Sequence, residues 1–138
     1  MTNLSKAMAI SKILAENIRN LHRNLVGANF FSDHALLEEW YHKMDDISDD
    51  IVETGIMLGE EEKSLLNLNG VYASVPEGTN FSNEDVFQYV YNFFHALIDT
   101  LIDCKSEVPG DVYSHFEEYI FYLRKEADYK IKHRLGSR

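Results

Sequence analysis

The chain has 138 residues, of which 45% are hydrophobic and 12% aromatic, so it can form a globular core and is neither disordered nor fibrous. Its 23 acidic and 13 basic residues give a formal net charge of −10, which repels nucleic acid and attracts cations. A single cysteine, Cys104, excludes an internal disulfide and a cysteine-rich zinc site. We therefore expect one domain over residues 1–138.

Cysteine usage and hydropathy also bear on location. A lone thiol is typical of a reducing compartment, and no run of 18 apolar residues occurs. The first residues, MTNLSKAMAISKILAENI, lack a long apolar segment followed by a cleavage site. These features predict a cytoplasmic protein that neither crosses a membrane nor carries a signal peptide.

Apolar residues recur at three- and four-residue spacing in the long segments of the chain, which is the period of amphipathic helices. The predicted helices cover residues 4–26, 33–58, 83–106 and 110–133, with a short helix near 60–68. Gly27 follows the first helix and is a natural stop. Ser32 or Asp33 is the expected N-cap of the second helix. Ser82 with Asp85 resembles a capping box for the third.

The connections between these helices define their topology. Turn signals at Asn69-Gly70 and Pro76-Glu77-Gly78 mark one long middle connection, and Pro109-Gly110 marks a short one. No strand pattern competes with the helices. A long middle crossover lets the second and third helices run parallel, so we expect an all-α, ferritin-like four-helix bundle with a short helix in the crossover.

One face of the second predicted helix carries side chains of the kinds that bind metals. Four residues fall within a sector about 100° wide when 100° is allowed per residue: His34, Glu38, Asp49 and Glu53. The sector borders the apolar stripe, so these side chains are expected to be partly desolvated. Like charges at this spacing repel each other, and a bound cation would relieve the repulsion.

Helix rise limits how one ion can be held on this face. His34 and Glu38 are about 6 Å apart along the axis, but Glu38 and Asp49 are about 16 Å apart. Two copies of the helix, packed antiparallel about a two-fold axis, would bring the first pair of one chain beside the second pair of the other. The helices would then cross near Lys43 and Met44. His22, near the end of the first helix, lies at the right height to join His34 and Glu38.

The stretch HRNLVGANFFSDHALLEEWYHKMDDISDDIVE, from His22 to Glu53, resembles the Dps mini-ferritins. The family pattern has a histidine, a glycine with an N-F-F segment, and a second histidine twelve residues after the first. Acidic residues follow four, fifteen and nineteen positions beyond the second histidine. Every one of these positions matches in this sequence, so the spacing is specific.

The resemblance implies a bundle that assembles into a homododecameric shell and a ferroxidase-type oxidoreductase acting on metal ions. Iron, as Fe(II) and Fe(III), would be oxidised with hydrogen peroxide and stored, which protects against oxidative damage. The implied ligands are His22, His34 and Glu38 from one subunit with Asp49 and Glu53 from its partner.

Three features depart from the family. Arg23 stands where a tryptophan usually follows the first histidine, and Thr54 stands where an arginine commonly follows the last glutamate. The N-terminal segment carries only Lys6 and Lys12, so it lacks the basic tail by which some relatives bind DNA. We therefore expect no DNA binding through this end.

Other patterns carry weaker signals. Glu39 and His42 form an isolated E-x-x-H pair, which we interpret as solvated. His95 and His115 are expected to be packed or surface residues, and the aromatic residues of the last two helices to form core and oligomer contacts. Basic residues gathered toward the C-terminus are interpreted as complementing a helix dipole. Two alternatives stay open: a shell or bundle without turnover that acts as a structural protein, and a DNA-compacting protein that uses the basic C-terminal end.

Overall fold

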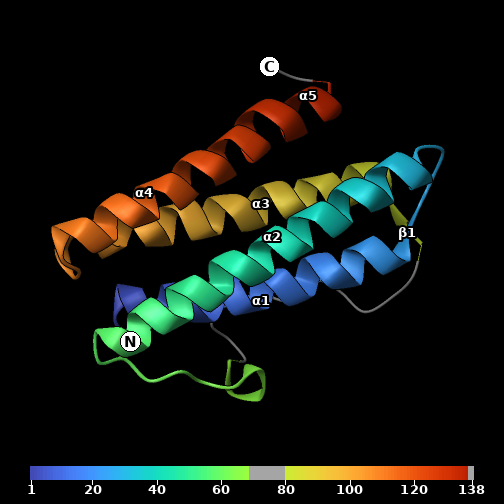
Figure 1. Cartoon of the computed structure of the whole chain (residues 1–138). Helices are drawn as coiled ribbons and strands as arrows, with labels where there is room; N and C mark the ends of the chain where they lie inside the picture. Colours follow the sequence, from blue (N-terminus) through green and yellow to red (C-terminus); the bar gives the residue numbers. More distant parts are fainter. Residues whose placement is uncertain (69–79, 137–138) are drawn as a thin grey trace.

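Four long helices make up most of the described chain, which covers residues 1–68 and 80–136 (Figure 1). In this computed structural model they are α1 (Asn3–Asn24), α2 (Phe30–Met57), α3 (Asn83–Asp103) and α4 (Gly110–Arg124). The last helix continues as a π-helix, η3 (Lys125–Ile131), and ends as α5 (Lys132–Arg134). The helix α1 packs against α2 and α3, and α3 packs against α4. The predicted all-α bundle is confirmed, with α2 and α3 running in the same direction (Figure 1).

The core lies between the four helices and follows the predicted apolar stripes. Trp40 from α2 packs edge-on against Phe87 and Phe94 from α3, with ring centroids 5.7 and 5.5 Å apart. All three side chains are buried, as is Phe116 from α4. Burying such large apolar surfaces is the main force that holds the helices together. None of the described helices is long and apolar enough to cross a membrane.

The helix starts agree with the sequence in one case and differ in another. The hydroxyl of Ser82 accepts a hydrogen bond from the backbone N–H of Asp85, as predicted for α3. The helix α2 begins earlier than expected, with Asn29 as its N-cap, so the assignment of Ser32 or Asp33 was wrong. The Asp33 side chain is buried and takes part in contacts with other helices, so it is not available for capping.

The crossover and the short strands also differ from the prediction. Only a 3₁₀ turn, η1 (Leu65–Asn67), forms where a short helix near 60–68 was expected. Two residues of the first connection, β1 (Leu25–Val26), pair in parallel with β2 (Phe81–Ser82), although no strand was expected. This pairing joins the C-terminal end of α1 to the N-terminal end of α3. The turn signals at 69–70 and 76–78 lie outside the described residues.

The turn between α1 and α2 depends on Gly27. Its φ angle is +145°, and a Cβ atom added there would lie 1.7 Å from Oδ1 of Asn83 at the start of α3. We expect Gly27→Ala to lower the free energy of unfolding by about 1–3 kcal/mol, as measured by urea denaturation. Gly59 has φ +95° and no atom within 4 Å of its added Cβ, so Gly59→Ala is the matched control and should cost less. Equal losses in both variants would contradict a steric role for Gly27.

Candidate metal centre

Two histidines meet where α1 ends and α2 begins. The rings of His22 and His34 have centroids 4.5 Å apart, although the residues are twelve positions apart in the chain. His22 is buried, with 8% of its surface exposed, and His34 is half-buried. Two of the three residues predicted for the first half of the site, His22 and His34, therefore lie side by side within one chain.

Hydrogen bonds fix which nitrogen of each ring is available. Nδ1 of His22 lies 2.7 Å from the carbonyl oxygen of Arg19, and Nδ1 of His34 lies 2.7 Å from the carbonyl oxygen of His22. A carbonyl oxygen only accepts, so both Nδ1 atoms carry the hydrogen and donate it. The neutral rings then present an unprotonated Nε2. Metal-binding histidines commonly have this arrangement, because the bond at Nδ1 orients the ring.

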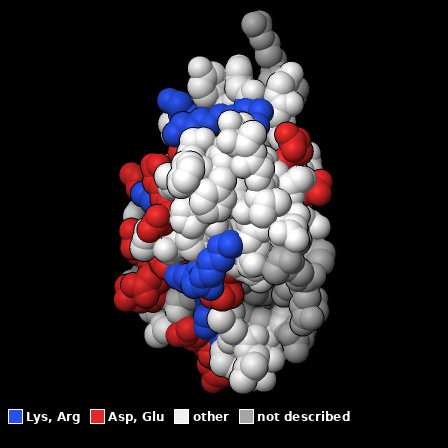
Figure 2. Space-filling view, turned by 90° about the vertical axis from the view of Figure 1, so that its right-hand side faces the viewer, with Lys and Arg blue, Asp and Glu red and all other residues white. Residues whose placement is uncertain are grey.

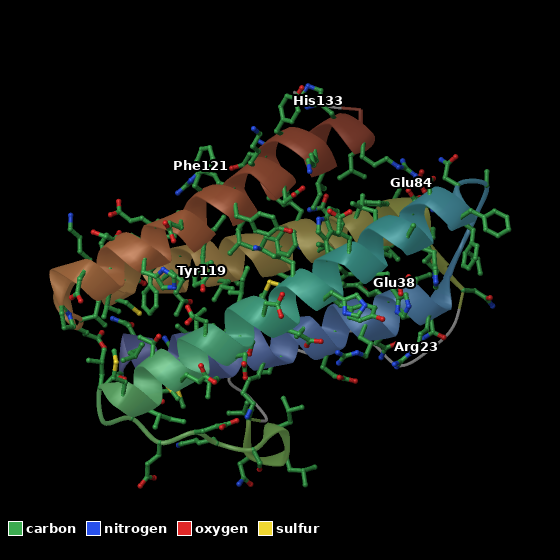
Figure 3. All side chains as sticks on the ribbon, in the orientation of Figure 1. Arg23, Glu38, Glu84, Tyr119, Phe121 and His133 are labelled. Carbon is green, nitrogen blue, oxygen red and sulfur yellow. The ribbon has the colours of Figure 1, made fainter. Side chains whose placement is uncertain are left out.

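The three carboxylates of the predicted site lie on the outer side of α2 and are exposed: Glu38, Asp49 and Glu53. The expectation that they would be partly desolvated was wrong for the single chain. Figure 3 shows Glu38 on the side of the molecule that also carries Arg23 from α1. Glu38 makes a weak contact with His42, in which Oε1 of Glu38 lies 3.9 Å from Nε2 of His42. These side chains are accessible to an ion or to a second chain.

Asp49 and Glu53 line an open groove between α1, α2 and the crossover. Two basic side chains, Lys12 and Arg19, also line the groove, but each is already paired with an acidic side chain. Lys12 contacts Glu62 at 2.6 Å, and Arg19 contacts Asp45 at 2.6 Å. No salt bridge to Asp49 or Glu53 occurs in the described part of the chain, so their charges remain available to a bound cation.

The two halves of the predicted site do not meet in a single chain. Among residues 1–68 and 80–136, no three His, Cys, Asp or Glu side chains converge in a way that would hold a metal ion. The pair His22 and His34 lies at one end of α2, and Asp49 and Glu53 lie more than two turns beyond Glu38. The predicted histidine and carboxylate ligands therefore cannot all bind one ion within a single chain.

Arg19 and Tyr41 also belong to the surroundings of the histidines, and sequence reasoning missed the role of Arg19. The Tyr41 ring lies 4.7 Å from the His22 ring, and the Arg19 guanidinium carbon lies 4.9 Å above the Tyr41 ring. Arg19 joins α1 to α2 through Asp45. These contacts join residues 19 to 26 positions apart in the sequence, so no local pattern indicated them.

A buried ionic contact fixes the beginning of α2 beside His34. Asp33 accepts hydrogen bonds from Asn83 of α3 and from Arg134 of α5, whose Nη2 lies 2.8 Å from Oδ2. The Asp33 side chain is only 5% exposed. Three helices that are distant in sequence therefore meet at the residue before His34.

The remaining histidines, the cysteine and the E-x-x-H pair lie outside this cluster. His95 contacts Asp128 at 2.7 Å and is half-buried, while His115 is exposed and contacts Asp50 at 2.6 Å. Glu39 and His42 are exposed, as expected for a solvated pair. Burial, with the nearby Glu107 and Asp103 carboxylates, raises the pKa of the Cys104 thiol to about 12, so it stays protonated.

Three basic residues of the C-terminal end, Lys130, Lys132 and Arg134, lie beside acidic side chains. Lys130 contacts Glu126 at 3.0 Å, and Arg134 contacts Asp33 at 2.8 Å. Lys132 lies 4.0 Å from Asp128. Acidic side chains gather along one edge of the molecule when the bundle is viewed from the end that carries the α1–α2 turn (Figure 2). A continuous basic surface is therefore not formed by these three cations.

Four helices, a long middle crossover and a histidine pair beside an acidic helix face define a ferritin-like bundle. Solved structures of Dps proteins have the same fold as this chain. Dps from Microbacterium arborescens in the high iron form has a TM-score of 0.86 at 19% identity, with 98% of this chain and 91% of that chain covered. A Dps protein from Bacillus brevis has a TM-score of 0.83 at 22% identity, with 97% and 93% covered.

A third similar structure carries a broader description of its own protein. The Vibrio cholerae DPS protein, described as a member of a broad superfamily of ferritin-like diiron-carboxylate proteins, has a TM-score of 0.83 at 21% identity, with 97% of this chain and 87% of that chain covered. Neither a protein-family model nor a curated protein sequence matches this chain. The likeness establishes the fold: this chain has the fold of the Dps mini-ferritins.

The contact between Asp33 and Arg134 gives a prediction about stability. Arg134→Gln leaves the buried Asp33 carboxylate without its cation, and we expect the free energy of unfolding to fall by about 1–3 kcal/mol in urea denaturation. Lys132→Gln removes a longer, more exposed contact two residues away and should change it by less than about 1 kcal/mol. A loss in Arg134→Gln no larger than that of Lys132→Gln would show that the Asp33 contact contributes little.

Proposed function

We propose that this protein oxidises Fe(II) to Fe(III) with hydrogen peroxide and stores the ferric product inside a dodecameric shell in the cytoplasm. The observation that carries the proposal is the histidine pair. His22 and His34 lie 4.5 Å apart, each with Nδ1 bonded to a backbone carbonyl, and they share one side of the bundle with unneutralised carboxylates. Imidazole together with carboxylate is a donor set that suits iron.

The proposed centre is shared between two chains. His22, His34 and Glu38 would come from one subunit and Asp49 and Glu53 from its partner, so each pair of chains has two centres. The open groove at Asp49 and Glu53 supports this arrangement, because a partner chain has access to it. At the level where the two α2 helices would cross, Met44 is buried and Lys43 lies over the Tyr122 ring. Contacts there would therefore involve exposed side chains such as Lys43 and His42.

The residues contribute binding and charge to the reaction. Two Fe(II) ions lose one electron each, and hydrogen peroxide takes up both electrons and two protons to give two water molecules. The three carboxylates stabilise the more highly charged Fe(III) relative to Fe(II), because each adds negative charge near the ion. The two imidazole rings, whose orientations are fixed by their Nδ1 hydrogen bonds, bind the substrate ion at a defined position. Consuming iron and peroxide together removes the reagents that form hydroxyl radicals.

Iron oxidation by single variants tests the site. After Fe(II) and hydrogen peroxide are mixed with the iron-free protein, ferric absorbance should rise faster than without protein. His34→Ala and Asp49→Ala should each reduce the rate to the protein-free value, because each removes one half of every centre. Asp46→Ala is the matched control, since it removes an exposed acid from the same helix outside the ligand set. A wild-type rate equal to that without protein would leave only a structural role.

Mixing the two inactive variants separates a shared centre from one within a single chain. A dimer with one His34→Ala chain and one Asp49→Ala chain has one intact centre and one doubly damaged centre. Activity should therefore reappear after dissociation and co-assembly. Mixed dimers that stay inactive, when wild-type protein recovers from the same treatment, would contradict the shared arrangement.

The DNA-compacting alternative predicts a different measurement. Because Lys130, Lys132 and Arg134 lie beside acidic partners, we expect no shift of duplex DNA in a gel at either low or moderate salt. A shift that weakens as salt rises and disappears when Arg124 and Lys125 are replaced by Gln would instead support DNA binding through the C-terminal end.

A further inference from the structure

We propose that His115, Asp50 and Tyr119 form a separate binding site for a ferric ion, between α2 and α4. Nε2 of His115 lies 2.6 Å from Oδ2 of Asp50 and 3.1 Å from the hydroxyl oxygen of Tyr119. The Tyr119 hydroxyl also donates a hydrogen bond to the same Asp50 oxygen. Three donor atoms of different chemical kinds, an imidazole nitrogen, a carboxylate oxygen and a phenol oxygen, therefore face one another.

The position of the three residues makes the site reachable. Tyr119 projects from α4 toward α2 (Figure 3), and Asp50 is the α2 residue that contacts it. The side chains of His115 and Asp50 are 45% and 37% exposed. An ion can therefore approach from solvent and keep water in its remaining coordination positions. None of these residues belongs to the proposed oxidation centre.

The other ring nitrogen of His115 is already held. Nδ1 lies 3.1 Å from Oε2 of Glu118. A metal-binding imidazole commonly donates its second N–H to a carboxylate, which fixes the ring and makes the ligating nitrogen more basic. With Glu118 in this position, the ring can bind an ion through Nε2 without losing its orientation.

The donor set favours Fe(III). A phenolate is a hard anionic oxygen ligand, and with the Asp50 carboxylate it places two negative charges on the ion. The Tyr119 phenol must lose its proton to bind an ion as a phenolate, so the ion has to polarise the bound oxygen strongly. Fe(III) polarises a bound oxygen more strongly than Fe(II) does. Its binding forms bonds to the phenolate, carboxylate and imidazole and releases the phenol proton, with the Nε2 proton as well where the ring is charged.

The site also has a place beside the proposed function. Asp50 follows Asp49 directly, so the two Cα atoms are about 3.8 Å apart. A ferric ion released from the oxidation centre would have to pass around α2 to reach this site, because successive side chains of a helix point about 100° apart. This part of the inference rests on the proposed function, whereas the binding site itself does not.

Fe(III) supplied directly as its nitrilotriacetate complex tests the site without any oxidation step. The iron-free wild-type protein should develop the visible charge-transfer absorbance of an Fe(III)–phenolate unit and saturate near one Fe(III) per chain. Tyr119→Phe removes only the hydroxyl group and should abolish the band. Tyr113→Phe, on the same helix and outside the cluster, is the matched control and should keep it. Glu118→Ala should weaken Fe(III) binding by about tenfold or more.

Two further measurements separate this site from the oxidation centre. Tyr119→Phe should keep the wild-type initial rate of Fe(II) oxidation, and His34→Ala should keep the Fe(III)–phenolate band. Absence of the band in the wild type, or its persistence in Tyr119→Phe, would overturn the proposed site. Failure of Fe(II) oxidation in the wild type with an intact band would instead refute the proposed function alone.

Discussion

The hydrogen bond from the His34 ring to the carbonyl oxygen of His22 is the contact on which the candidate centre depends. It joins the end of α1 to the beginning of α2 and fixes the tautomer of His34. The carbonyl of Arg19 does the same for His22. Because both acceptors are main-chain atoms, the ring orientations follow from the helix geometry itself. A displacement of either helix end would change the 4.5 Å separation of the two rings.

The surrounding contacts restrain those helix ends. Gly27 lets the chain turn closely past Asn83, and Asn83 in turn contacts the buried Asp33 carboxylate next to His34. Arg134 completes this group from the far end of the chain. On the outer face of α2, in contrast, Asp49 and Glu53 have no salt bridge in the described residues. The fold thus combines a rigid histidine pair with acidic groups that remain free to bind a cation.

Much of this arrangement could be predicted from the sequence, because it depends on local periodicity. The spacing of apolar residues indicated four helices, and the Ser82 cap of α3 was found by its local signature. The predicted N-cap of α2 was wrong, because the Asp33 side chain binds Asn83 and Arg134. These residues lie 50 and 101 positions further along the chain. The pairing of β1 with β2 depends on a similar long-range approach and left no pattern in two-residue strands.

In the candidate site, too, features with a local sequence pattern were predicted and features that depend on neighbouring helices were not. The spacing of His22, His34 and Glu38 could be compared with a known pattern, and the structure brings the two histidines together. The exposure of the carboxylates was mispredicted, because a helical wheel gives direction but not the distance to neighbouring helices. His115 was expected to be a packed or surface residue and is exposed. Its contacts with Asp50 and Tyr119 join α2 to α4 and cannot be deduced from either segment alone.

The location of iron in a crystal of the assembled protein soaked with Fe(II) tests the shared centre most directly. Anomalous scattering at the iron edge identifies the ion without reference to activity. A shared centre predicts a peak within coordination distance of His22, His34 and Glu38 of one chain and of Asp49 and Glu53 of its two-fold partner. A peak coordinated by side chains of one chain only, with Asp49 and Glu53 of every neighbouring chain distant from it, would contradict the account.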